Sequence, residues 1–190
     1  MAQLDIRLLG NPEIYLDGAT ISTDRRKAVA LLAYLAVTGQ RHSRAHLATF
    51  FWPDSDQSRA LAYLRRTLWE INTMLGDEWL DANRDSVALP LTDKVALDTA
   101  VLTAIANQSQ PDADTLANAA ALYRGDFMAG FTLRDSPAFD DWQTLQSQTC
   151  RLQLGQLLET LITTHETAAN WTAAEAAVLL VEGHAQPAEF

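Results

Sequence analysis

The sequence predicts a mainly α-helical protein with a mixed α+β N-terminal part. This prediction depends on three observations: short alternating apolar segments before residue 25, three helical patterns and then a hairpin pattern in residues 25–91, and helical periodicity over residues 97–167. The 190 residues are 48% hydrophobic and 20% charged, which is enough to bury a substantial core. With only eight Gly and six Pro, the composition excludes collagen-like and disordered chains.

The chain before residue 25 predicts a small antiparallel β-meander. Apolar and polar side chains alternate over residues 4–8 and again over 14–16, with a turn-forming Asn-Pro pair between them. Asp17-Gly18 then precedes a third short apolar step at residue 21. Short alternating segments separated by turn signals are typical of a small antiparallel meander.

Two helices are predicted next. The first covers residues 25–38, with Asp24 as its N-cap and Gly39 as its stop signal. The second follows Ser43, a good N-cap residue, and ends where a proline at position 53 disfavours a helical residue before it.

The third predicted helix, residues 58–75, is the most informative element. Its leucines and its isoleucine recur every three or four residues and therefore share a core-facing side. Another side carries basic and aromatic residues at the same spacing, so these residues form one exposed strip. The strip consists of Arg59, Ala62, Tyr63 and Arg66, with Arg65 beside it.

A β-hairpin is predicted directly after this helix. Residues 79–83 and 87–91 form short strand patterns around a turn that places Arg84 at its tip. Three helices, of which the last is basic and amphipathic, followed at once by a hairpin are typical of a winged helix, which lays its last helix in the DNA major groove. We therefore predict that residues 1–92 form a winged-helix DNA-binding domain with a small antiparallel β-meander.

The charge distribution supports this division. The net charge is −10, yet residues 1–90 hold ten Lys/Arg against eleven Asp/Glu, a net of −1, whereas residues 91–190 hold four against thirteen, a net of −9. Within the first half, residues 25–66 hold eight basic residues against two acidic ones, a local excess of +6. Such an asymmetry indicates polyanion binding, with a solvated basic face as the alternative.

Several separated segments resemble the Streptomyces antibiotic regulatory protein family. Residues 25–35 (RRKAVALLAYL), 51–54 (FWPD) and 60–68 (ALAYLRRTL) are similar to its DNA-binding domain. Residues 95–98 (VALD) and 122–131 (LYRGDFMAGF), with FDDW at 139–142, are similar to its bacterial transcriptional activator domain. The resemblance implies a response-regulator-type winged helix, a tetratricopeptide-like helical domain, and binding of direct repeats in promoters by more than one copy.

The periodicity of the second half agrees with an all-α domain over residues 93–190. Helices are expected near 97–105, 116–123 and 137–167. Asn170-Trp171 with Ala174, and Pro187 after them, resemble the second helix of a tetratricopeptide repeat. Because repeat arrays need several units, the sequence predicts either a truncated chain from a longer regulator or a naturally short family member with an exposed last helix.

Each candidate DNA contact has an expected role. Arginine bonds guanine through two donors at once, so the residues of the exposed strip are expected to reach base edges, whereas cations beside it hold phosphates. The expected base contacts are Arg59, Tyr63 and Arg66. The expected phosphate and wing contacts are Arg25, Arg26, Lys27, Arg65 and Arg84.

No catalytic residue, metal site or cofactor is predicted. His42 and His46 lack a third ligand nearby, which favours a surface or phosphate-facing role over a metal site. Residues 125–130 have the two glycines of a phosphate loop but lack its lysine. Cys150, the only cysteine, is interpreted as a packed small hydrophobe, and the five tryptophans as core or interface anchors. The sequence shows no set of nucleophile, base and oxyanion donors that would indicate an enzyme.

The leading hypothesis is a sequence-specific transcriptional regulator, an activator, that reads promoter repeats in double-stranded DNA with helix 58–75 and a wing around Arg84. The acidic helical half would contact RNA polymerase or another protein, and a homodimer would form on DNA. The alternative is a tetratricopeptide-like protein–protein interaction module whose winged helix does not bind DNA. The longest apolar run is too short to cross a bilayer and no export signal is evident, so a cytoplasmic protein without membrane contact is expected.

Overall fold

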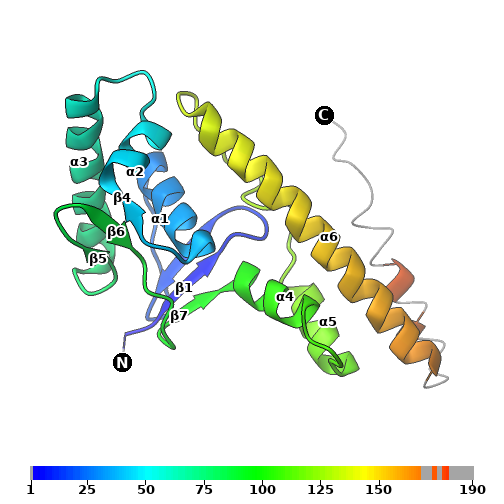
Figure 1. The fold of residues 1–190 in the computed structure, drawn as a ribbon. Helices are drawn as coiled ribbons and strands as arrows, with labels where there is room; N and C mark the ends of the chain where they lie inside the picture. The colour runs from blue at the N-terminus through cyan, green and yellow to red at the C-terminus, as the bar shows by residue number, and fades with distance from the viewer. Residues whose placement is uncertain (1, 168–172, 175–176, 180–190) are drawn as a thin grey trace.

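A computed structural model describes residues 2–167, 173–174 and 177–179, and the structural statements below concern these residues. The described chain is mainly α-helical, with two small sheets confined to the first hundred residues (Figure 1), which confirms the predicted fold class at this level. Asn170-Trp171 and Pro187, on which the predicted repeat depends, lie outside the described residues. Within the described part, no helix has the length and apolar character needed to span a membrane.

The N-terminal meander forms as predicted and gains one more strand. The sheet contains β1 (Leu4–Arg7), β2 (Glu13–Leu16), β3 (Ala19–Thr20) and β7 (Val95–Leu97), in the order β3-β2-β1-β7. The first three strands pair antiparallel, whereas β7 pairs parallel with β1, with Leu4 opposite Val95. Local patterns did not indicate β7, because it has three residues and its partner is the distant start of the chain.

Three helices follow the meander close to the predicted bounds. They are α1 (Arg26–Thr38), α2 (Arg44–Phe51) and α3 (Gln57–Leu75). The Ser43 and Asp56 side chains cap α2 and α3, and Gly39 ends α1 in a left-handed conformation with φ of +59°. The prediction that Asp24 caps α1 was wrong: Arg25 is the N-cap residue, and no side chain caps this helix.

The hairpin is shorter than predicted and belongs to a second sheet. It consists of β5 (Asp81–Ala82) and β6 (Ser86–Ala88), and β6 also pairs with β4 (His42–Ser43), the strand that leads into α2. The sheet order β4-β6-β5 therefore fixes the hairpin to the segment between the first two helices.

The second half forms three helices. They are α4 (Asp98–Ala106), α5 (Ala113–Ala121) and α6 (Pro137–Thr167). Figure 1 shows α6 passing from α2 to α4 and α5, and it packs against all three. Its buried side is formed by residues such as Phe139, Leu154 and Leu158, whereas Leu145 and Leu152 are exposed.

The segment 124–129 joins the two halves through its backbone. The Met128 N–H donates to the Leu8 carbonyl at 2.7 Å, and the Ala129 N–H donates to the Gly10 carbonyl at 2.9 Å. Gly10 has φ of +117°, and a Cβ there would lie 3.2 Å from the Arg124 Cβ, so this close approach requires glycine. The amides of the glycine-containing loop thus hold the chain together rather than facing a ligand.

Asp98 is the second connection between the halves. Its carboxylate, 5% exposed, accepts the N–H groups of Leu8 (2.8 and 2.9 Å) and Leu9 (2.8 Å), as well as that of Thr99 at the start of α4 (2.8 Å). The Arg124 guanidinium lies 3.8 Å away. One continuous apolar core contains residues from both halves, and β7 of the second half pairs with β1, so the predicted division at residues 92 and 93 interrupts neither the core nor the N-terminal sheet.

Candidate nucleic-acid interface

The candidate interface starts from α3, whose two sides differ sharply. Leu64, Ile71 and Leu75 on one side are buried in the core. On the other side, the predicted base contacts are exposed, and the Tyr63 side chain has 46% of its surface open to solvent. The core therefore explains one side of the helix and leaves a basic, aromatic surface on the other. This surface, here called the α3 face, consists of Arg59, Ala62, Tyr63, Arg65, Arg66, Trp69 and Thr73.

Two arginines of the α3 face have carboxylate partners, one at the N-cap of α3 and one within the helix. Arg59 Nε lies 3.3 Å from the Asp56 carboxylate, and Arg66 Nε lies 3.3 Å from the Glu70 carboxylate. The Arg59–Asp56 pair is exposed and contributes little, because water screens it and two side chains must be ordered. A phosphate or guanine can therefore replace the Asp56 carboxylate at small cost, whereas the Glu70 carboxylate is largely covered and has Arg25 as a second partner. Arg65 has no ion pair or hydrogen-bond partner among the described residues.

Glu70 brings the start of α1 alongside the α3 face. Arg25 Nε lies 3.8 Å from the same Glu70 carboxylate that Arg66 approaches, while Glu70 itself is largely covered. Arg25 and Arg66 are therefore neighbours although 41 positions separate them in the sequence. Of the three predicted phosphate contacts on the first helix, Arg25 is the one that the structure places beside the α3 face.

Arg26 and Lys27 have internal partners instead. The Arg26 guanidinium donates to the Thr132 carbonyl at 2.8 and 3.0 Å and lies 4.4 Å above the Phe131 ring. The Lys27 ammonium donates to the Phe51 carbonyl and lies 3.1 Å from the Asp135 carboxylate. These two cations fasten residues 131–135 to α1 and α2, a role that the sequence did not indicate. Phosphate contacts by Arg26 and Lys27 stay a prediction. Such contacts would require these side chains to release their bonds to Thr132, Phe51 and Asp135.

Arg84 lies at the tip of the β5–β6 hairpin and is exposed, as expected for a wing residue. The Asn83 side chain shapes the tip by accepting the Asp85 and Ser86 N–H groups, each at 2.9 Å. Arg44, at the start of α2, donates its backbone N–H to the Asp85 carbonyl and its Nε to the Asn83 carbonyl, both at 2.8 Å. Sequence spacing missed Arg44 because its partners lie about 40 residues further along the chain.

Trp69 is an unexpected member of the α3 face. Of the two roles expected for the tryptophans, core anchor or interface anchor, the structure excludes the core role for Trp69, because 66% of its surface is exposed. It lies three residues after Arg66 and four after Arg65, so all three point from the same part of the helix surface.

The two histidines near the start of α2 form a stacked pair. Their ring centroids lie 5.6 Å apart, His42 Nε2 lies 2.8 Å from the Thr38 hydroxyl, and His46 Nε2 lies 3.2 Å from the Tyr34 hydroxyl. Among the described residues, no group of three or more possible metal ligands forms. The imidazoles instead link β4 and α2 to α1.

This pair predicts a pH dependence of stability. Burial, and then the neighbouring His46, lower the pKa of His42 below its ordinary value of 6.5. The folded protein therefore binds this proton less readily than the unfolded chain, so the stabilising contribution is present above pH 6.5 and is lost as the pH falls below it. We expect the urea midpoint to fall between pH 7.5 and pH 5.5, and to fall less in His42→Gln. If the urea midpoint changed with pH equally in wild type and His42→Gln, the pH dependence would not come from His42.

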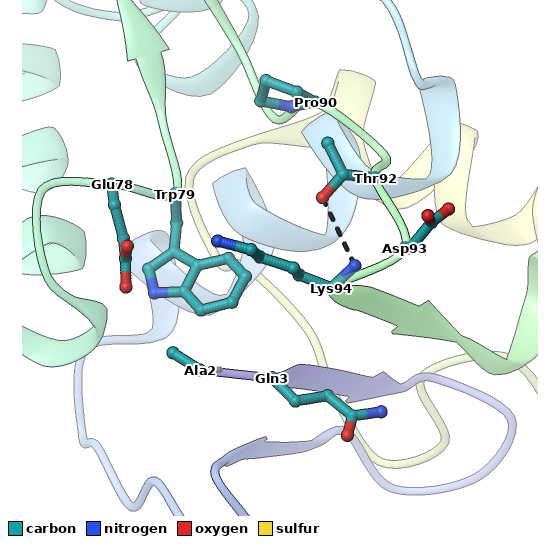
Figure 2. Close-up of a pocket in the computed structure, with 8 residues that line it drawn as sticks. All are labelled: Ala2, Gln3, Glu78, Trp79, Pro90, Thr92, Asp93 and Lys94. Carbon is teal, nitrogen blue, oxygen red and sulfur yellow. Dashed lines mark hydrogen bonds between the residues drawn. The ribbon is translucent and has the colours of Figure 1, made fainter.

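A pocket of about 600 Å³ lies beyond the C-terminal end of α3 and is distinct from the α3 face. Figure 2 shows the Lys94 side chain extending toward the Trp79 indole, with the Glu78 carboxylate on the other side of the ring. One ammonium therefore stands against the carboxylates of Glu78 and Asp93, and this balance of charge does not favour binding of a polyanion.

Cys150 lies away from this pocket, on α6. Burial raises the pKa of its thiol to about 11, so this side chain stays protonated at neutral pH, as a packed residue would.

Comparison with known proteins identifies a structural likeness. No protein-family model matches the sequence, and no curated protein matches it. The fold is similar to a solved structure of Mycobacterium tuberculosis EmbR in complex with a low-affinity phosphopeptide, with a TM-score of 0.60 at 20% identity. The match covers 96% of this chain and 60% of that chain, so this protein spans less than two thirds of the length of its structural neighbour. The likeness includes both halves of the chain and shows that they adopt the mainly α, partly α+β fold of EmbR.

Proposed function

We propose that this chain is a DNA-binding transcriptional regulator in which α3 is the recognition helix and the β5–β6 hairpin is the wing. The observation that carries the proposal is the α3 face, where arginines and aromatic residues are exposed on a helix whose opposite side is buried in the core. In winged helices the last of three helices enters the major groove, and the following hairpin contacts the flanking DNA. The order α1, α2, α3, β5, β6 suits this geometry.

Charge and resemblance support the same proposal. The basic excess of residues 25–66 includes Arg59, Arg65 and Arg66 of α3, while the second half carries a net charge of −9. The acidic half is repelled by phosphates, which favours DNA contact through the first half. The motifs that resemble the Streptomyces antibiotic regulatory protein family, together with the fold shared with EmbR, support a regulator built from these two parts.

The finer roles are part of the proposal. We assign base contacts to Arg59, Tyr63 and Arg66, and phosphate contacts to Arg25, Arg65 and the wing residue Arg84. The helical half is proposed to be tetratricopeptide-like and to contact RNA polymerase or another protein, which would make the regulator an activator. Two copies are proposed to bind a direct repeat as a homodimer on DNA.

Selection of bound sequences from random duplex DNA tests the proposal. The full chain is the right sample, because the core is shared between the halves and the first half cannot be assumed to fold alone. We expect enrichment of a repeated sequence, and we expect the logarithm of the affinity to fall linearly as the logarithm of the salt concentration rises. Failure to retain any duplex at low salt would contradict the proposal, and enrichment of single sites without a repeat would contradict the homodimer.

A further inference from the structure

Trp69 presents an indole to solvent that the fold does not use. Three of the other tryptophans, Trp52, Trp79 and Trp142, are buried or half-buried and pack against the core, whereas Trp69 is 66% exposed on the fourth turn of α3. Aromatic residues and arginines are the side chains most enriched where proteins bind partners. An exposed tryptophan next to two arginines therefore indicates contact with a partner.

The surroundings of Trp69 favour an anionic partner. Arg65 precedes it by one turn and has no partner among the described residues, and Arg66 precedes it by three residues. The nearby acidic residue, Glu70, is largely covered and faces Arg25 and Arg66, so its charge is already compensated. The surface around the indole thus carries uncompensated positive charge, which suits the phosphates of DNA better than an acidic or apolar protein surface.

The rise of the helix places Trp69 relative to a groove. At 1.5 Å per residue, Arg66 lies about 10 Å along the axis from Arg59, and Trp69 lies about 15 Å from it. The major groove is about 12 Å wide, so a helix that brings both arginines to base edges carries Trp69 to the rim of the groove. The rim is the sugar-phosphate backbone.

We propose that Trp69 docks on the DNA backbone at the rim of the major groove. Its ring packs on a deoxyribose, its Nε1–H donates to a phosphate oxygen, and Arg65 holds the adjacent phosphate. The inference rests on the proposed DNA binding and adds to it a neutral contact that releases no counterion. Trp69 therefore supplies affinity that is independent of both salt and sequence, unlike the arginines around it.

Binding measurements across a salt series test this role. In full-length protein, Trp69→Ala is expected to weaken binding about tenfold, to the selected site and to an unrelated duplex alike, with an unchanged salt slope. Trp69→Phe keeps an aromatic ring but loses the N–H, so a smaller loss is expected. Leu152→Ala, which removes another exposed apolar side chain from the second half, is the matched control and should bind as wild type does.

Fluorescence gives a second readout that does not depend on affinity. The emission of wild type minus that of Trp69→Phe reports Trp69, and acrylamide, which is uncharged, should quench it in the free protein but much less in the DNA complex. The inference would be overturned, with DNA binding left intact, by any of three results: Trp69→Ala binds as wild type does, its salt slope is reduced, or quenching of Trp69 persists in the DNA complex. Protection of Trp69 by a protein partner but not by DNA would also overturn it. If the wild type binds no duplex, the proposed function itself fails.

Discussion

Replacing Asp98 by alanine is expected to lower the free energy of unfolding by about 3 kcal/mol, because it leaves buried N–H groups without acceptors. The carboxylate accepts N–H groups from Leu8, Leu9 and Thr99, and so joins β1 to the start of α4. Each unsatisfied buried donor costs about 1 to 3 kcal/mol, partly recovered where water enters. Urea unfolding, followed by circular dichroism, measures the loss.

The control for this prediction is Asp98→Asn, which keeps the shape and one acceptor oxygen. The loss is expected to be smaller than in Asp98→Ala because one acceptor oxygen remains, and some loss persists because the amide nitrogen faces backbone N–H groups that need an acceptor. Burial raises the pKa of Asp98 above its ordinary value of 3.8, although the backbone N–H groups and Arg124 counteract part of this shift. The folded state therefore holds this proton more firmly than the unfolded chain does, so this contribution to stability is present below pH 3.8 and is lost as the pH rises through the raised pKa. The difference between wild type and Asp98→Asn should therefore narrow as the pH rises from 4 to 7, and a constant difference would contradict the assignment.

Replacing Arg66 and Arg65 by alanine, one at a time, is expected to separate base contact from phosphate contact. Arg66→Ala should lose about 1 to 3 kcal/mol on the selected site and should discriminate less between bases at one position of that site. Arg65→Ala should weaken binding to all sequences by a similar factor and reduce the salt slope by about one. Titration of labelled duplexes at several salt concentrations measures both effects.

The matched control for these variants is Arg134→Ala, which removes an exposed arginine from the second half. It leaves the α3 face unchanged and should alter neither base preference nor the salt slope. Arg65 and Arg66 are both exposed, so folding should be preserved in their variants as well. If affinity and slope stay unchanged in both Arg65→Ala and Arg66→Ala, α3 is not the DNA-binding element.

Much of the fold was predictable because its signals are local. Ser43, Asp56 and Gly39 act within one turn of the helix ends that they define, and the long α6 has the predicted bounds 137–167. The side of α3 that faces solvent followed from residue spacing, since a helix repeats every 3.6 residues. For the same reason, the exposure of Arg59, Tyr63 and Arg66 was correctly predicted, whereas their contacts with DNA stay a proposal.

The sequence by itself determined the helices, the meander, the hairpin and the division of charge that separates a near-neutral first half from an acidic second half. The tertiary structure decided which distant residues meet: β7 with β1, Asp98 with the Leu8 and Leu9 amides, Arg25 with Glu70, and Arg26 and Lys27 with residues 131–135. It also decided that Trp69 faces solvent. Periodicity and caps report forces between near neighbours along the chain, whereas these contacts depend on packing between segments up to about 100 residues apart, which no local pattern encodes.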